Sequence, residues 1–135
     1  MDKNKQPGIK CNSIILVESI FKRKPRIPKE QDIKLSFDVK NSISEDQQNL
    51  VTEVTAIINS EEEPVFAKVT YVGLFSVGED KNLDLKDFSE INAPAILFPY
   101  IREEIHTRML KAGLPKSLIL PPINFVALVN DNNCE

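Results

Sequence analysis

The chain of 135 residues contains few side chains that could carry out catalysis or hold a metal ion. His106 is the only histidine, and Glu103 stands three positions before it, which is half of a di-iron carboxylate pattern. Such a site needs a second copy of the pattern and further carboxylates on facing helices. With one histidine this assignment fails, and His106 is better explained as a polar residue on a helix face.

The two cysteines offer no site either. Cys11 and Cys134 lie near opposite ends of the chain, without the paired spacing of zinc ligands and without a histidine close by in the sequence. The chain has four glycines and no glycine-rich phosphate-binding loop. We therefore expect a protein that is not an enzyme and that uses no metal ion, nucleotide or other cofactor.

Charge and hydrophobicity exclude two more classes of protein. The formal net charge is -3 and the sequence pI is about 5.3, whereas nucleic-acid-binding domains present a strongly basic surface. No apolar run reaches the roughly 18 residues of a membrane span, and no signal-peptide pattern is present. Two thiols outside any disulfide framework fit a reducing compartment. We expect a cytoplasmic protein without nucleic-acid binding or membrane insertion.

Hydrophobic alternation predicts four β-strands, at 13–21, 32–41, 49–59 and 65–77, with a hairpin turn at 61–64. Because the links are short, we expect an antiparallel meander within a single domain over 1–135, with flexible ends at 1–12 and 130–135. In the first strand, period two places four residues on one face: Ile15, Val17, Ser19 and Phe21. Gly73 is expected to mark a bulge or a close approach to the backbone.

The segment after a short helical turn at 85–91 predicts a long helix, with Asn92 as its N-cap and Gly113 just beyond its end. Pro99 should kink this helix or force a second start. The helix carries an apolar stripe of Ile101, Ile105 and Met109. We assign this stripe to an oligomer interface, because one sheet and two helices offer little shelter for it.

The next segment, LPKSLILPPINF at 114–125, is too rich in proline for a helix or a central strand and too apolar for an ordinary loop. A short final helix is predicted at 124–129. An apolar segment that takes no regular form could cover the sheet, or it could remain available for contact with another polypeptide. Both uses can hold, since one side of the segment can pack while the other binds.

Two stretches carry a resemblance to a known family. PAILFPYIREEIHTRMLKAGLPKSLILPPINFVAL (94–128) and GLFSV (73–77) resemble the SecB family of export chaperones. The resemblance implies an α+β fold, a four-stranded antiparallel sheet with one long and one short C-terminal helix. It also implies a homotetramer, a dimer of dimers, that holds unfolded client polypeptides without nucleotide and hands them to the SecA motor.

The resemblance further implies an apolar client groove made by the sheet, the crossover and the final helix. Carried over by position, its residues are Ile33, Leu35, Phe37, Val65, Phe66, Leu118, Leu120, Phe125 and Leu128. Some of these residues must belong to the ordinary core instead, and the sequence does not sort them.

The chain departs from the family at the surface that faces SecA. Lys24 and Lys68 stand where family members usually carry acidic residues, and only NDNNCE follows Val129 in place of a longer tail. Reversed charges disfavour binding to SecA. Two functions therefore remain: a general chaperone that keeps precursors competent for export, or a dedicated interaction protein that protects one partner, such as an antitoxin, without SecA.

Overall fold

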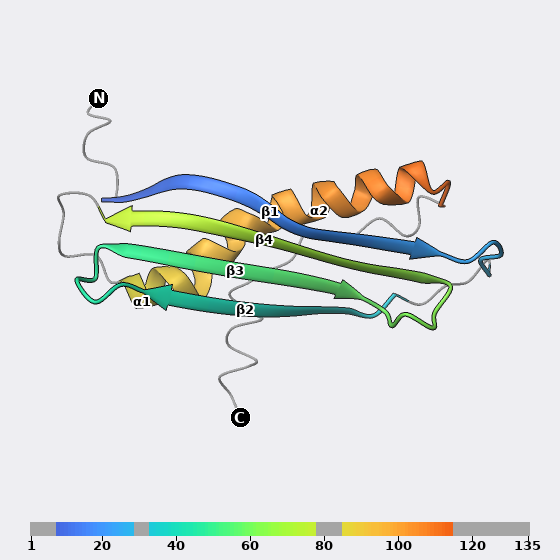
Figure 1. Ribbon diagram of the computed structural model, residues 1–135, viewed down its shortest axis with the longest axis horizontal. Helices are drawn as coiled ribbons and strands as arrows, with labels where there is room; N and C mark the ends of the chain where they lie inside the picture. Colours follow the sequence, from blue (N-terminus) through green and yellow to red (C-terminus); the bar gives the residue numbers. More distant parts are fainter. Residues whose placement is uncertain (1–7, 29–32, 78–84, 115–135) are drawn as a thin grey trace.

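The computed structural model describes residues 8–28, 33–77 and 85–114, which form an antiparallel sheet with a helical segment along one face (Figure 1). The strands are β1 (Ile9–Arg23), β2 (Leu35–Ile43), β3 (Asn49–Ile58) and β4 (Val65–Val77). The helical segment consists of α1 (Leu85–Asp87), a π-helical turn η2 (Phe88–Asn92) and α2 (Ala93–Lys111). The predicted α+β class, the four-stranded antiparallel sheet and the long helix are confirmed.

The order of the strands differs from a simple meander. β2, β3 and β4 follow one another as predicted, but β1 pairs with β4, and the sheet order is β1-β4-β3-β2. Short links favour pairing between consecutive strands, but the chain leaves β1 by a longer loop before it enters β2. β4 is largely buried along its length, so it needs a neighbour on both sides, and β1 supplies the second one.

β1 also departs from the predicted period of two. Register shifts between Cys11 and Ser13 and between Leu16 and Glu18 show two irregularities in its pairing with β4. An extra residue in a strand moves every following side chain to the other face. Ile14 and Phe21 therefore both pack against the core, whereas Val17 is 58% exposed. The prediction that Val17 shares a face with Phe21 is wrong.

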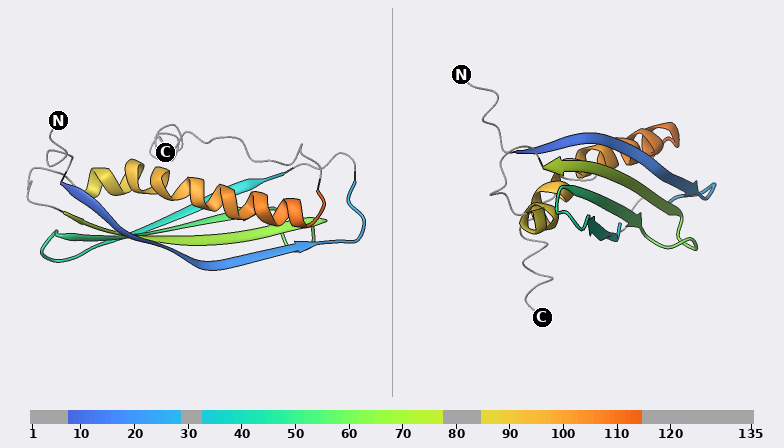
Figure 2. Two further views of the ribbon diagram at one scale, coloured as in Figure 1. Left: turned by 90° about the horizontal axis from the view of Figure 1, so that it is seen from above. Right: turned by 60° about the vertical axis from the view of Figure 1, so that its left-hand side comes forward.

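α2 runs along one face of the sheet, as the view from above shows (Figure 2). Its stripe of Ile101, Ile105 and Met109 is buried in a core cluster with side chains of β3 and β4. The assignment of this stripe to an oligomer interface is therefore wrong, because the sheet of the same chain already covers it. No helix among the described residues is both long and apolar enough to cross a membrane.

The helix begins earlier than its predicted cap. Asn92 has helical backbone angles and makes no side-chain capping bond, because α1 and η2 precede α2 without a break. The short helical turn predicted at 85–91 is present, and it continues directly into α2. Pro99 lies inside α2, which continues through the proline without a second start.

The end of α2 follows the prediction. Gly113 has a φ of 71°, and its N–H donates to the Leu110 carbonyl, while the Leu114 N–H donates to the Met109 carbonyl. These two bonds form a Schellman motif, which uses the left-handed conformation that glycine adopts most easily. The Arg23 guanidinium at the end of β1 also donates to the carbonyl of Ala112.

Gly73 confirms the prediction of a close approach. A Cβ atom at this position would lie 2.7 Å from Cε2 of Phe75 and 3.0 Å from Cδ2 of Leu97. Because Gly73 has no side chain, α2 can pack directly on β4 at this position.

We expect Gly73→Ala to lower the free energy of unfolding by about 1–3 kcal/mol, the usual cost of overpacking. Combined with Leu97→Ala, it should cost less than the sum of the two changes, because the smaller side chain makes room. Gly113→Ala is the control: it strains the backbone but meets nothing within 4 Å, so its cost should add to that of Leu97→Ala. Denaturant titration measures all five variants, and additivity at Gly73 would contradict the proposed contact.

Candidate binding surfaces

The first candidate surface lies on the helix side of the sheet, beside α2. α2 packs chiefly on β4 and β3, at the centre of the sheet. We call the apolar residues at the neighbouring edge the β2 strip: Ile33, Leu35, Phe37 and Val39. The first three pack against the rim of the core while staying partly exposed, and Val39 is 37% exposed. The strip therefore offers partly exposed apolar surface beside α2.

Aromatic contacts join the β2 strip to α2. The rings of Phe37 and Phe98 meet edge to face with their centroids 5.5 Å apart, and the Arg102 guanidinium carbon lies 5.8 Å from the Phe98 ring centroid. Phe98 was not among the predicted site residues, although its spacing from Ile101 and Ile105 continues the apolar stripe. Val39 was missed as well, although it extends the alternation of Leu35 and Phe37.

The structure separates the two groove residues that were predicted on β4. Val65 is fully buried in the core on the helix side. Phe66 follows it in the strand, so its side chain points to the opposite face, where it is 6% exposed. These two residues cannot line the same groove. The remaining predicted groove residues lie outside the described part of the chain: Leu118, Leu120, Phe125 and Leu128.

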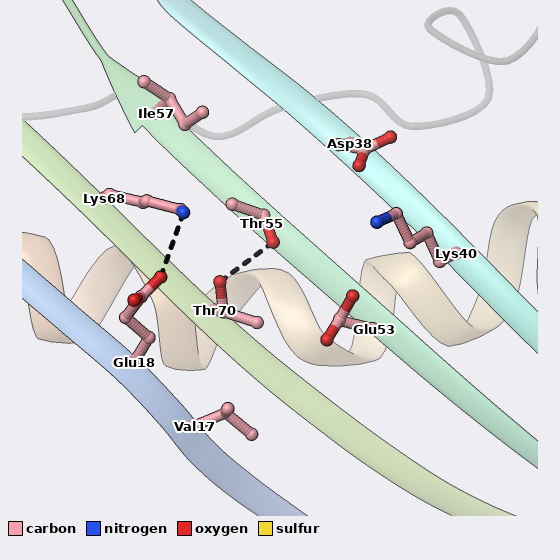
Figure 3. A pocket seen from close by; sticks show the side chains of 9 residues that line it. All are labelled: Val17, Glu18, Asp38, Lys40, Glu53, Thr55, Ile57, Lys68 and Thr70. Carbon is pink, nitrogen blue, oxygen red and sulfur yellow. Dashed lines mark hydrogen bonds and ion pairs between the residues drawn. The ribbon is translucent and has the colours of Figure 1, made fainter.

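The second candidate surface is a hollow of about 370 Å³ on the outer face of the sheet. Figure 3 shows the side chains from all four strands that line it: Val17, Glu18, Asp38, Lys40, Glu53, Thr55, Ile57, Lys68 and Thr70. The hydroxyl oxygens of Thr55 and Thr70 lie 2.9 Å apart in a hydrogen bond. The hollow thus combines three carboxylates with two ammonium groups and is not of one sign.

Lys68, one of the two positions predicted to face SecA, lies in this hollow. Its Nζ is 3.1 Å from Oε1 of Glu18, and the two side chains are 37% and 41% exposed. Lys24 does not line the hollow. Its backbone N–H donates to the Pro64 carbonyl and its Nζ donates to the Glu62 carbonyl, so it lies at the turn between β3 and β4. The two lysines therefore occupy different surroundings.

Few titratable groups among the described residues have a shifted pKa. Burial raises the pKa of Tyr71 above its ordinary value of 10.0, and the carboxylates of Glu104 and Glu103 add to this effect. Tyr71 is therefore a neutral hydroxyl near pH 7. Within residues 8–28, 33–77 and 85–114, no three His, Cys, Asp or Glu side chains gather closely enough to hold a metal ion.

The sequence matches a known protein family and several individual relatives. A family model described as preprotein translocase subunit SecB matches residues 14–135. An uncharacterized protein of Methanocaldococcus jannaschii is 32% identical over 120 residues, covering 84% of this chain and 76% of that protein. The protein-export protein SecB of Azoarcus sp. is 27% identical over 137 residues, covering 95% and 89%. That of Anaplasma phagocytophilum is 38% identical over 76 residues, covering 53% and 48%.

A solved structure shares the fold. It is the SecB-like chaperone of Mycobacterium tuberculosis in complex with a ChAD peptide from the HigA1 antitoxin. The two chains superpose with a TM-score of 0.70 at 18% sequence identity, covering 86% of this chain and 88% of the other.

Proposed function

Because this chain belongs to the SecB family, we propose that it is a chaperone that binds non-native polypeptides through apolar surface, without ATP or another cofactor. The SecB proteins among its relatives are named as protein-export proteins, which supports a role before export, in the cytoplasm. The observation that carries the proposal is the β2 strip, where Ile33, Leu35 and Phe37 remain partly exposed beside α2.

The physical basis of holding is the burial of apolar surface. An unfolded chain exposes side chains that a folded protein hides, and burying them stabilises a complex by roughly 25 cal/mol per Å². This interaction is non-directional, so it tolerates many client sequences. The groove residues predicted outside the described part of the chain, Leu118, Leu120, Phe125 and Leu128, are further candidates for contact with a client.

We expect the protein to suppress aggregation of a denatured enzyme diluted into buffer, as followed by light scattering, equally well with and without ATP. Phe37→Asp and Leu120→Asp should each weaken holding by about tenfold or more, because client binding would bury an unpaired carboxylate. Ser36→Asp is the matched control, since it adds the same charge to the next position of the strand on the outer face. Full holding by folded Phe37→Asp and Leu120→Asp variants would disprove the groove.

We also propose that the protein is a homotetramer, built as a dimer of dimers. The apolar stripe of α2 is buried against the sheet of its own chain, so the protomers of a tetramer must contact one another through another surface. β1 is an edge strand with three successive exposed apolar residues, Ile15, Leu16 and Val17. Exposed apolar residues that stand together favour contact with another chain.

Light scattering should therefore give the mass of a tetramer, or of a dimer at low concentration. Val17→Asp should reduce this mass, because association would bury the new charge, whereas Ser36→Asp, at an exposed position of β2, should leave it unchanged. A monomeric wild-type protein at micromolar concentration would contradict the assembly. An unchanged mass for Val17→Asp would exclude β1 as the interface.

The second candidate function is a dedicated interaction protein that protects one partner without SecA. One observation favours it: the solved fold neighbour is a complex with a peptide from an antitoxin. The lysines at positions 24 and 68 favour it too, because a partner surface that complements acidic residues would be repelled there.

We expect SecA from the same organism to bind weakly. Lys68→Glu should strengthen binding by about twofold to fivefold, most at low salt, because exposed charge pairs contribute about 0–1 kcal/mol each. Adding Lys24→Asp should strengthen it further. Lys111→Glu makes the same charge change at the end of α2 and should have no effect. Titration at two salt concentrations tests this, and submicromolar binding of the wild-type protein would restore the coupling to SecA.

A further inference from the structure

The two edges of the sheet differ in regularity. β1 pairs with β4 through two register shifts, and such bulges are one way in which proteins prevent a strand from joining an open edge. β2 pairs with β3 at nine successive positions without a shift and contains no proline. Its charged residues, Asp38 and Lys40, belong to the outer face, so the helix side of this edge carries no charge.

The backbone groups of β2 alternate between β3 and the open edge. The Asn59 N–H donates to the Lys34 carbonyl at 2.9 Å, and the Ser44 N–H donates to the Asn49 carbonyl at 2.9 Å. Because the register between these two bonds is unbroken, the even-numbered residues of β2 are the ones that bond to β3. The N–H and C=O groups of Leu35, Val39, Asn41 and Ile43 therefore point away from β3. In the part of the chain that the structure describes, no strand pairs with that side.

Three of these residues, Leu35, Val39 and Ile43, present apolar side chains to the helix side, whereas the Asn41 side chain is an amide that donates to the Ser89 carbonyl. Leu35 and Ile43 pack partly against the two core clusters, and Val39 is more exposed than either. In an antiparallel pair, residues that exchange hydrogen bonds have side chains on the same face. A polypeptide that added to this edge would therefore place every second side chain on the helix side, next to the β2 strip.

We propose that β2 binds an extended segment of a non-native polypeptide as an added antiparallel strand. The occupant has apolar residues at every second position, and the backbone N–H groups of those residues donate to β2. An unfolded chain offers such backbone groups freely, whereas a folded protein has already paired them. The inference rests on the proposed chaperone function and defines how its clients are recognised.

The experiment compares the two sets of N–H groups of one peptide. The probe is a fluorescein-labelled synthetic peptide of alternating leucine and serine with lysines at both ends, and binding to the full chain is followed by fluorescence anisotropy. N-methylation of three leucines should weaken binding by about tenfold or more, because it removes donors that face β2. N-methylation of three serines should change binding by less than about threefold. Equal effects, or a larger effect at the serines, would overturn the proposal.

A variant of the protein tests the same edge from the other side. Val39→Pro removes a backbone N–H that points away from β3, a position at which an edge strand tolerates proline. It should weaken binding of the unmethylated peptide about tenfold, whereas Val39→Thr, which keeps the N–H and the branched shape, should weaken it less than about threefold. If Val39→Pro fails to fold, the methylated peptides decide.

The two levels of the proposal can fail separately. If a denatured enzyme is held but methylation and Val39→Pro have no effect, strand addition is wrong and the chaperone function stands. If neither the peptide nor the denatured enzyme binds, the chaperone function is wrong and strand addition falls with it.

Discussion

The packing of α2 onto the centre of the sheet is the contact on which the rest of the structure depends. It requires Gly73 on β4, because any larger side chain would meet Leu97 and Phe75. It also uses the whole apolar stripe of the helix, with Ile101 and Ile105 fully buried. Since α2 lies chiefly over β4 and β3, the helix covers the two outer strands, β1 and β2, less than the two central ones.

This division suits the two edges to the different uses that we propose for them. β1 is long and irregular and exposes Ile15, Leu16 and Val17 together, which suits a fixed contact between specific surfaces. β2 is short and regular and offers generic backbone groups beside a partly covered apolar strip. The proposed client binding would use this lack of detail in sequence, because backbone hydrogen bonds and apolar burial are available to almost any unfolded chain.

Local patterns in the sequence predicted much of the fold. The alternation in β2, β3 and β4, the hairpin turn after β3 and the glycine at the end of α2 were all found from neighbouring residues. The pairing of β1 with β4 was not predicted from the sequence. It follows from the burial of β4, which requires a neighbour on both sides, and not from any pattern within β1. The bulge near Val17 was missed for a similar reason, since one inserted residue leaves no mark on composition but reverses every later side chain.

The candidate site was less predictable than the fold. Phe37 and Leu35 were predicted as groove residues because they alternate in an obvious strand, but period two cannot tell a residue under a helix from one beside it. Val65 and Leu35 both belong to the helix side, yet only Val65 lies in the sealed core, since β4 is central and β2 is an edge. Strand order, which the local pattern did not contain, therefore decides which apolar residues stay partly exposed at an edge.

The outer face of the sheet carries charged side chains, whereas the helix side carries apolar ones. Lys68 is already paired with Glu18, so a partner that contacts this lysine must displace the pair or accommodate both charges. Both side chains remain partly exposed, and such a pair contributes little to stability. Its effect falls instead on partner choice, because a surface with carboxylates and ammonium groups side by side attracts neither a basic nor an acidic partner strongly. Under the proposed function, the apolar edge would be permissive toward clients, while the charged face would be selective toward any protein that receives them.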